Sequence, residues 1–259
     1  MSFLKNIVEK KKVQIGSLAV EIEKMTPAPI AKKSFSTAIG INNKLHLIAE
    51  IKRSCPSHGI IKHDLDIKEM VQAYEKGGAS ALSIITEQEY FKGSFKDIVE
   101  IKHHTSLPVL AKDFIIDVSQ VTMAHYSGAD AILLIMNILD DKTYRKLFTA
   151  ATEKGMEVLA EVHSRDEITR AMSMPLTMIG VNRRNLNTLI IDKTKTEELA
   201  SYLPERALKI AESGIDNKEE FAKFHELGYN ACLIGSSIVR SNSPEYFIRE
   251  LLSCNDDKE

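Results

Sequence analysis

Acidic and basic residues stand two positions apart at the ends of short apolar runs in this sequence. Glu50 and Lys52 end the run L-H-L-I-A-E-I-K, Glu161 and His163 lie in A-E-V-H, and Lys112 follows P-V-L-A. If these runs are β-strands, residues two apart point to the same side, because side chains alternate along a strand. Ammonium and carboxylate groups gathered in this way can donate and accept protons, so the spacing indicates general acid–base chemistry.

Polar or small residues end nearly all the other apolar runs as well. They are Thr86, Glu87, Asp113, Asn137, Asn182, Arg184, Glu212, Ser213, Gly235 and Ser236. A single lysine or glutamate at a strand end is more often a solvated residue or one half of a salt bridge. Several charged positions together favour a functional cluster, provided that one sheet carries all of these strands.

Two segments, A-E-S-G-I at residues 211–215 and I-G-S-S-I at residues 234–238, place small residues directly after apolar runs. Backbone amides of such residues can approach an anion closely, because glycine has no Cβ in the way. A phosphate group would suit them, although the same dipeptides also form ordinary tight turns.

Eight apolar runs predict the strands that must position these residues. They are residues 45–52, 81–86, 108–112, 131–135, 157–162, 178–182, 208–212 and 231–235. Amphipathic segments between them predict helices over Ile67 to Lys76, Phe95 to His104, Ser119 to Tyr126, Lys142 to Lys154, Asp166 to Met172, Thr194 to Tyr202 and Asn217 to Leu227. Eight strand–helix units predict an α/β fold of the (β/α)8 TIM-barrel type, with an open doubly wound sheet as the alternative. In such a barrel the active site lies at the carboxyl ends of the strands.

The first 44 residues do not fit the repeat. Leu4 to Lys24 has the pattern of a helix, and T-P-A-P-I-A-K-K-S-F, at residues 26–35, is predicted to be a linker because its prolines disfavour helix. We therefore expect one structural domain, in which a helical extension at residues 1–44 packs on a barrel formed by residues 45–259.

Composition narrows the classes of partner. The chain has 259 residues, 44% hydrophobic and 27% charged, with a formal net charge of −2 and basic residues spread along it. These values predict a soluble globular protein that binds a small molecule rather than nucleic acid or a membrane. The N-terminus has charges where a signal peptide needs an apolar core, so we expect a cytoplasmic protein. Cys55, Cys232 and Cys254 have no metal-site or disulfide spacing and are expected to be reduced thiols.

Taken together, these segments resemble the indole-3-glycerol phosphate synthase family of tryptophan biosynthesis. In order along the chain they are A-E-I-K-R-x-x-P-S, T-E-Q-E-Y-F-K-G-S, K-D-F, A-E-V-H, N-x-R-N-L, A-E-S-G-I and L-I-G-S-S, and the opening L-K-N-I-V-E-K-K-K is similar as well. The resemblance implies conversion of 1-(2-carboxyphenylamino)-1-deoxyribulose 5-phosphate to indole-3-glycerol phosphate, carbon dioxide and water. It also implies that neither a metal nor an organic cofactor takes part.

The resemblance further implies a role for each catalytic residue. Lys112 would be the general acid that protonates the ketone oxygen of the substrate during ring closure. Lys52 would pair with the anthranilate carboxylate, with Glu50 orienting and balancing the two lysines. Glu161 would be the general base that helps to expel the hydroxyl group, and Asn182 would hold substrate groups by hydrogen bonds. Ser213 completes this catalytic set.

The remaining residues of the implied site bind substrate. They are Cys55, Ser57, Phe91, Phe114, Leu133, Arg184, Gly214, Leu233, Gly235 and Ser236. The two phenylalanines and Leu133 would pack on the anthranilate ring, with ordinary core packing as the alternative. Ser213, Gly214, Gly235 and Ser236 would lie near the phosphate.

The sequence departs from the family pattern at Cys55, where a serine commonly precedes the proline. A thiol is a weak hydrogen-bond donor, so a side-chain contact with the phosphate should be weaker here. Ala111 and Arg183 also differ from common members of the family, but strand alternation places both away from the barrel mouth.

Other functions remain open from the residues alone. A different phosphate-binding barrel, such as phosphoribosylanthranilate isomerase or a ribulose-phosphate epimerase, would share the last two loops. It would not need lysines at two strand ends. A non-catalytic sensor of a phosphorylated metabolite is the alternative outside enzymes. We expect a monomer, with a weak dimer as the alternative state.

Overall fold

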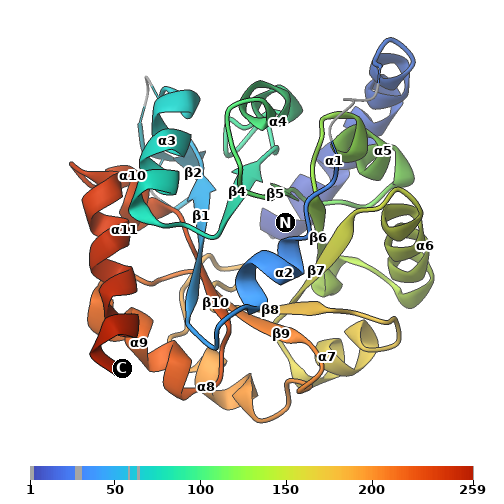
Figure 1. Ribbon diagram of the computed structural model, residues 1–259. Coiled ribbons are helices and arrows are strands. Elements are labelled where there is room, and N and C mark those ends of the chain that lie inside the picture. The colour runs from blue at the N-terminus through green and yellow to red at the C-terminus, as the bar shows by residue number, and fades with distance from the viewer. Residues whose placement is uncertain (1–2, 27–30, 58, 63–64, 259) are drawn as a thin grey trace.

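Eight parallel strands close into a barrel in the computed structural model, which describes residues 3–26, 31–57, 59–62 and 65–258 (Figure 1). The strands are β1 (His46–Ile51), β4 (Ala81–Ile85), β5 (Val109–Lys112), β6 (Ala131–Ile135), β7 (Glu157–Val162), β8 (Met178–Asn182), β9 (Leu208–Glu212) and β10 (Ala231–Ile234). Their order around the barrel follows the chain, and β10 pairs with β1 to close it. The predicted TIM barrel and all eight predicted strands are confirmed.

Helices surround the barrel between successive strands. They are α3 (Ile67–Gly77), α4 (Phe95–Lys102), α5 (Val118–Tyr126), α6 (Asp141–Glu153), α7 (Arg165–Ala171), α8 (Lys195–Ala200), α9 (Lys218–Glu226), α10 (Ser236–Arg240) and α11 (Pro244–Leu252), with short 3-10 turns η1 (Met136–Ile138) and η2 (Ser253–Lys258). Most begin at an Asp, Ser or Asn whose side chain accepts a hydrogen bond from the first turn, as Asp66 does for α3. Helices α10 and α11 were not predicted, although Pro244 at the start of α11 is a common helix-initiating signal.

Side chains alternate between two apolar clusters along each barrel strand. In β1, Leu47, Ala49 and Ile51 pack outward against the helices, while Ile48 belongs to a smaller cluster inside the barrel. Glu50 is two residues from Ile48 and therefore points inward as well. The alternation that builds the core thus also directs the polar strand ends into the barrel mouth.

Helix α1 (Phe3–Ile22) contacts the carboxyl end of the barrel through its first half. Leu4 and Ile7 are buried in the inner cluster, and Lys11 forms a buried ion pair of 2.7 Å with Asp113, which directly follows β5. The predicted N-terminal helix is therefore present, and its first half is part of the roof of the barrel mouth.

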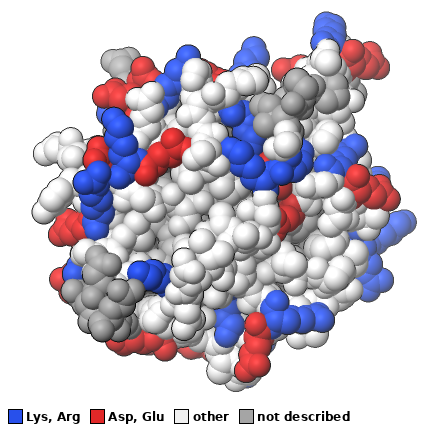
Figure 2. Space-filling view, viewed as in Figure 1, with Lys and Arg blue, Asp and Glu red and all other residues white. Residues whose placement is uncertain are grey.

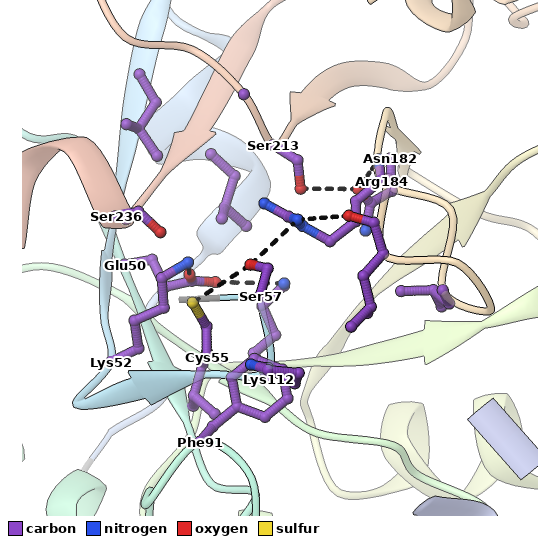
Figure 3. Close-up of a pocket in the computed structure, with 18 of the residues that line it drawn as sticks. Glu50, Lys52, Cys55, Ser57, Phe91, Lys112, Asn182, Arg184, Ser213 and Ser236 are labelled. Atoms are coloured by element: carbon purple, nitrogen blue, oxygen red, sulfur yellow. Dashed lines mark hydrogen bonds and ion pairs between the residues drawn. The ribbon is translucent and has the colours of Figure 1, made fainter. Parts of the chain in front are cut away.

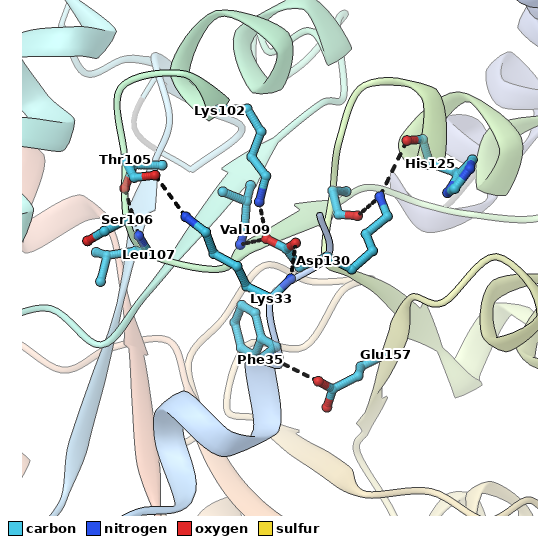
Figure 4. Close-up of polar contacts among 12 residues, drawn as sticks. Lys33, Phe35, Lys102, Thr105, Ser106, Leu107, Val109, His125, Asp130 and Glu157 are labelled. Carbon is cyan, nitrogen blue, oxygen red and sulfur yellow. Dashed lines mark hydrogen bonds and ion pairs between the residues drawn. The ribbon is translucent and has the colours of Figure 1, made fainter. Parts of the chain in front are cut away.

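Helix α2 (Phe35–Gly40) covers the opposite, amino end of the barrel (Figures 1 and 4). Phe35 and Ile39 are fully buried in the inner cluster, and the carboxylate of Glu157 accepts hydrogen bonds from the backbone N–H groups of Phe35 and Ser36 at 2.7 and 3.0 Å. This helix was not predicted, because the segment was expected to be linker up to Phe35. Part of that linker, residues 27–30, lies outside the described residues. A domain boundary at residue 44 stays a prediction.

Asp130 fixes the segment that leads into α2 (Figure 4). One carboxylate oxygen accepts a hydrogen bond from the N–H of Lys33 at 2.9 Å. The other accepts one from the N–H of Val109 at 2.7 Å and pairs with the ammonium of Lys102. Asp130 and Lys102 are both buried, so this pair joins the N-terminal segment to the amino end of β5 through contacts that water does not screen.

Charged side chains of both signs are interspersed on the face shown in Figure 2, rather than gathered into one basic area. In the part of the chain that the structure describes, no helix is both long and apolar enough to cross a membrane.

Candidate active site

Glu50 lies at the centre of the charged residues in the barrel mouth (Figure 3). Its two carboxylate oxygens face different lysines, Lys52 at 2.8 Å and Lys112 at 3.2 Å. Burial disfavours the charged carboxylate, but the two ammonium groups outweigh it and lower the pKa of Glu50 to about 2. Glu50 is therefore an anion at neutral pH that holds both lysines in place.

Glu212, at the end of β9, is a second carboxylate beside Lys112, at 3.7 Å. Burial and the neighbouring Glu161 raise the pKa of Glu212 to about 8. Burial disfavours the ammonium of Lys112, yet the surrounding carboxylates raise its pKa above the ordinary value. Sequence reasoning noted Glu212 as a strand end but did not include it in the site, because its approach to Lys112 depends on the closed barrel.

Two glycines make room for these carboxylates. A Cβ at Gly235 would lie 2.5 Å from Oε1 of Glu50, and one at Gly180 would overlap the carboxylate of Glu212. Side chains at these two positions would push the carboxylates away from the lysines. Gly235 therefore has a packing role in addition to the anion contact predicted for it.

Glu161 completes what we call the charged floor, which consists of Glu50, Lys52, Lys112, Glu161 and Glu212. Glu161 is 1% exposed, and within the described residues its Oε1 accepts no hydrogen bond. A carboxylate at the base of a pocket can take a proton from a bound molecule.

Asn182 is held by its neighbours so that its oxygen is already used. Oδ1 accepts hydrogen bonds from the hydroxyl of Ser213 at 2.8 Å and from the backbone N–H of Arg184 at 2.9 Å. The amide nitrogen is left to donate to a bound molecule. Ser213 thus orients Asn182, which is a contact that the sequence did not predict.

A short hairpin covers one side of the mouth. Its strands are β2 (Ser54–Cys55) and β3 (Gly59–Ile60), and its turn carries Ser57. Ser57 accepts a hydrogen bond from the guanidinium of Arg184 at 3.4 Å, and the thiol of Cys55 lies 3.6 Å from the hydroxyl of Ser57 (Figure 3). His58 lies outside the described residues. Arg184 therefore connects the loop after β8 to the loop after β1.

An aromatic wall faces the charged floor. The rings of Phe91 and Phe114 have centroids 6.4 Å apart, and Leu133 and Leu233 line the pocket beside them. The carboxylate of Glu87 accepts hydrogen bonds from the backbone N–H groups of Tyr90 and Phe91 at 2.7 and 3.0 Å, which fixes the loop that carries Phe91. Glu87, one of the polar residues predicted at a strand end, thus holds the shape of this loop.

The loops after β9 and β10 line the same pocket. Ser213 and Gly214 both have positive φ, 72° and 68°, and Gly235 precedes the first turn of α10. Successive backbone N–H groups in a turn can form a concave anion-binding site.

Every residue predicted for the site lines this one pocket, and their roles stay predictions. Sequence reasoning missed several loop and helix residues that also line it: Phe3, Leu186, Leu189, Ile191, Asp216, Ser237 and Arg240. Phe3 comes from α1, and no periodic signal in the sequence could have placed it here.

Comparison with known families matches residues 4–251 to the family described as indole-3-glycerol phosphate synthase. An indole-3-glycerol phosphate synthase of Bacillus cereus is 36% identical over 250 residues, which are 96% of this chain and 97% of that protein. One from Oceanobacillus iheyensis is 38% identical over 246 residues, 95% and 94% of the two chains.

Solved structures support the barrel. 3-Hexulose-6-phosphate synthase from Salmonella typhimurium superposes with a TM-score of 0.67 at 15% identity, over 83% of this chain and all of that chain. The tryptophan synthase A-subunit from Pyrococcus furiosus gives 0.60 at 15% identity, over 82% and 98%. At this level of identity the likeness shows the fold alone.

Proposed function

The chain belongs to the indole-3-glycerol phosphate synthase family, and we propose that its pocket performs that family's ring closure. The substrate is 1-(2-carboxyphenylamino)-1-deoxyribulose 5-phosphate, and the products are indole-3-glycerol phosphate, carbon dioxide and water. This reaction makes the protein a carbon–carbon lyase. The observation that carries the proposal is the charged floor, where ammonium and carboxylate groups lie between anion-binding loops and an aromatic wall.

The pocket has one region for each part of this substrate. The backbone amides at Ser213, Gly214, Gly235 and Ser236 receive the phosphate, and Phe91, Phe114 and Leu133 pack on the aromatic ring. Arg184, Cys55, Ser57 and Leu233 close the sides. Lys52, which Glu50 holds at 2.8 Å, pairs with the carboxylate of the anthranilate moiety. Binding at both ends sets the ketone carbon beside the aromatic carbon that attacks it.

Lys112 supplies the proton for ring closure. As the aromatic carbon bonds to the ketone carbon, the ketone oxygen gains negative charge and takes a proton from the ammonium. Lys112 is in the charged form needed for this step, since the surrounding carboxylates raise its pKa. Glu212, at 3.7 Å, holds a proton near neutral pH and can return it to the lysine. Loss of carbon dioxide then restores the aromatic ring.

Glu161 acts in the dehydration. The new hydroxyl group leaves as water with a proton from a lysine, and Glu161 accepts the proton lost from the neighbouring carbon as the second ring becomes aromatic. Asn182 donates its amide N–H to a substrate hydroxyl and keeps it aligned. These groups supply every proton transfer of the reaction from side chains, with no metal or organic cofactor in the scheme.

We further propose a cytoplasmic monomer in which residues 1–44 and the barrel form one structural domain. Its partner is this small phosphorylated substrate rather than nucleic acid or a membrane. The net charge of −2 supports a small-molecule partner. The burial of Phe35 and Ile39 of α2 in the inner cluster supports a single domain.

The test is turnover of the carboxyphenylamino-deoxyribulose phosphate, followed by indole fluorescence, with wild type, Lys112→Ala and Lys96→Ala side by side. Lys96 is exposed on α4 and controls for the loss of a lysine. We expect product from wild type and Lys96→Ala, and a loss of roughly a hundredfold or more for Lys112→Ala. No product from wild type would overturn the function, whereas equal rates for all three would overturn Lys112 as the acid.

A further inference from the structure

His163 lies just beyond the end of β7, beside Glu161 of the charged floor. Its Nε2 is 3.5 Å from Oε1 of Glu161, and its Nδ1 is 3.6 Å from Oε2 of Glu167. The side chain is 16% exposed, and neither ring nitrogen has a hydrogen bond within the described residues. The imidazole therefore stands between two carboxylates, close enough for ion pairing with both.

Glu167 is fixed in the first turn of α7. Its Oε2 accepts a hydrogen bond from the backbone N–H of His163 at 2.8 Å, and its Oε1 accepts one from the amide of Asn137 at 3.1 Å. Burial opposes the charged form, but these contacts lower the pKa of Glu167. An anchored anion thus lies on the side of the imidazole that faces away from the pocket.

The charges of the floor show what a cation at this position acts on. Three of its members are carboxylates and two are ammonium groups, which leaves one negative charge in excess when all are ionised. Glu161 and Glu212 repel each other, so one of them tends to keep a proton. A cation placed against Glu161 favours the state in which Glu161 is the ionised member of that pair.

His163 can be that cation near neutral pH. Burial disfavours the imidazolium, but Glu167, Glu161 and Glu212 outweigh it and raise the pKa of His163 above its ordinary 6.5. Glu167 of α7 and Glu161 of β7 lie against the ring, and Glu212 of β9 adds to the negative charge that acts on it.

We propose that His163 is a positioning residue for the base of the reaction. Held by Glu167, its imidazolium faces Glu161 through Nε2, keeps that carboxylate ionised and directed into the pocket, and leaves the shared proton on Glu212. The inference rests on the proposed function, in which Glu161 accepts the proton of the dehydration step. His163 does not line the pocket and acts through Glu161.

The first experiment is the pH dependence of kcat for wild type and His163→Gln. The variant removes the cation that faces Glu161, so the acid limb of the profile should move to higher pH. On the acid side of the profile kcat should fall severalfold, and the loss should shrink as the pH rises. KM should stay unchanged, because the residue does not contact substrate. A fall in kcat that is equal at every pH, or a wild-type profile, would overturn the proposal.

Glu167→Gln tests whether His163 needs the carboxylate of Glu167 beside its Nδ1. It removes the anion that supports the imidazolium but keeps groups that can bond to Asn137 and the backbone. The acid limb should move in the same direction by a smaller amount. Asp166→Asn is the matched control, since Asp166 lies in the same turn of α7 but is exposed. A shift as large for Asp166→Asn as for Glu167→Gln would refute a specific role for Glu167.

A titration of the native enzyme gives a result that does not require an active variant. The NMR signal of the His163 ring in wild type should titrate above 6.5, and Glu161→Gln should lower that value, because coupling between two groups is mutual. An unchanged His163 titration in Glu161→Gln would overturn the proposal. If wild type makes no product while the two side chains still titrate together, the proposed function fails and the pairing stands, so the two failures are distinguishable.

Discussion

Replacing Glu50 with Gln should destabilise the protein, because it removes the anion shared by Lys52 and Lys112. The pKa of Glu50 falls from an ordinary 4.5 to about 2 although burial opposes ionisation, so the lysines must more than offset that burial. At 1.36 kcal/mol per pKa unit, ionised Glu50 contributes about 3 kcal/mol to the folded state at neutral pH. The glutamine variant also leaves two partly buried ammonium groups without their shared partner, which acts in the same direction.

The pH dependence of this loss follows from the sign of the shift. A depressed pKa stabilises the folded state above the unfolded value of 4.5, and the contribution is lost as the pH falls toward 2. Between pH 7 and about pH 3.5, the advantage of wild type over Glu50→Gln should shrink by about 1.4 kcal/mol.

Urea unfolding at several pH values measures this difference directly. Glu205→Gln, which changes an exposed glutamate, is the control and should behave like wild type within about 0.5 kcal/mol. Equal stability of wild type and Glu50→Gln at pH 7 would refute the reasoning, as would a difference that stays constant with pH.

Three further perturbations test other parts of the structure. Gly235→Ala places a Cβ 2.5 Å from Glu50 and should lower kcat at least about tenfold. Gly16→Ala, with no atom within 4 Å of the new Cβ, should leave kcat unchanged. Normal kcat for Gly235→Ala would contradict the packing role. Cys55→Ser supplies a stronger donor and should lower KM up to about fivefold in the fluorescence assay, while an unchanged KM would mean that this side chain makes no contact with the substrate. Asp130→Asn leaves Lys102 buried without its partner and should lower the free energy of unfolding by about 3–5 kcal/mol. Asp141→Asn breaks an exposed pair with Arg170 and should cost under about 1 kcal/mol, so similar losses for the two variants would contradict the burial argument.

The barrel and the residues of its mouth could be predicted because both follow from one local pattern. Alternation along a strand places Glu50 inside when Ile48 is inside, and the same reasoning applies to Glu161. The sequence therefore indicates which side chains meet before the distances between them are known.

Elements that depend on long-range contacts could not be predicted in this way. Helix α2 is too short for a periodic signal, and its stability comes from Glu157 and from burial inside the barrel. The importance of Glu212 and His163 depends on neighbours from other strands and helices. Local patterns show that these residues end strands, but not that their charges are coupled.

The burial of α2 also has a consequence for how the chain reaches its native state. Phe35 and Ile39 leave the ribosome early, yet they pack inside a barrel that includes β9 and β10, which are synthesised much later. Until β10 pairs with β1, the apolar face of α2 has no complete binding site. Closure of the barrel must therefore wait for nearly the whole chain, so folding should be slow and dominated by contacts between distant residues. During that interval the nascent chain exposes a surface that a chaperone could shield.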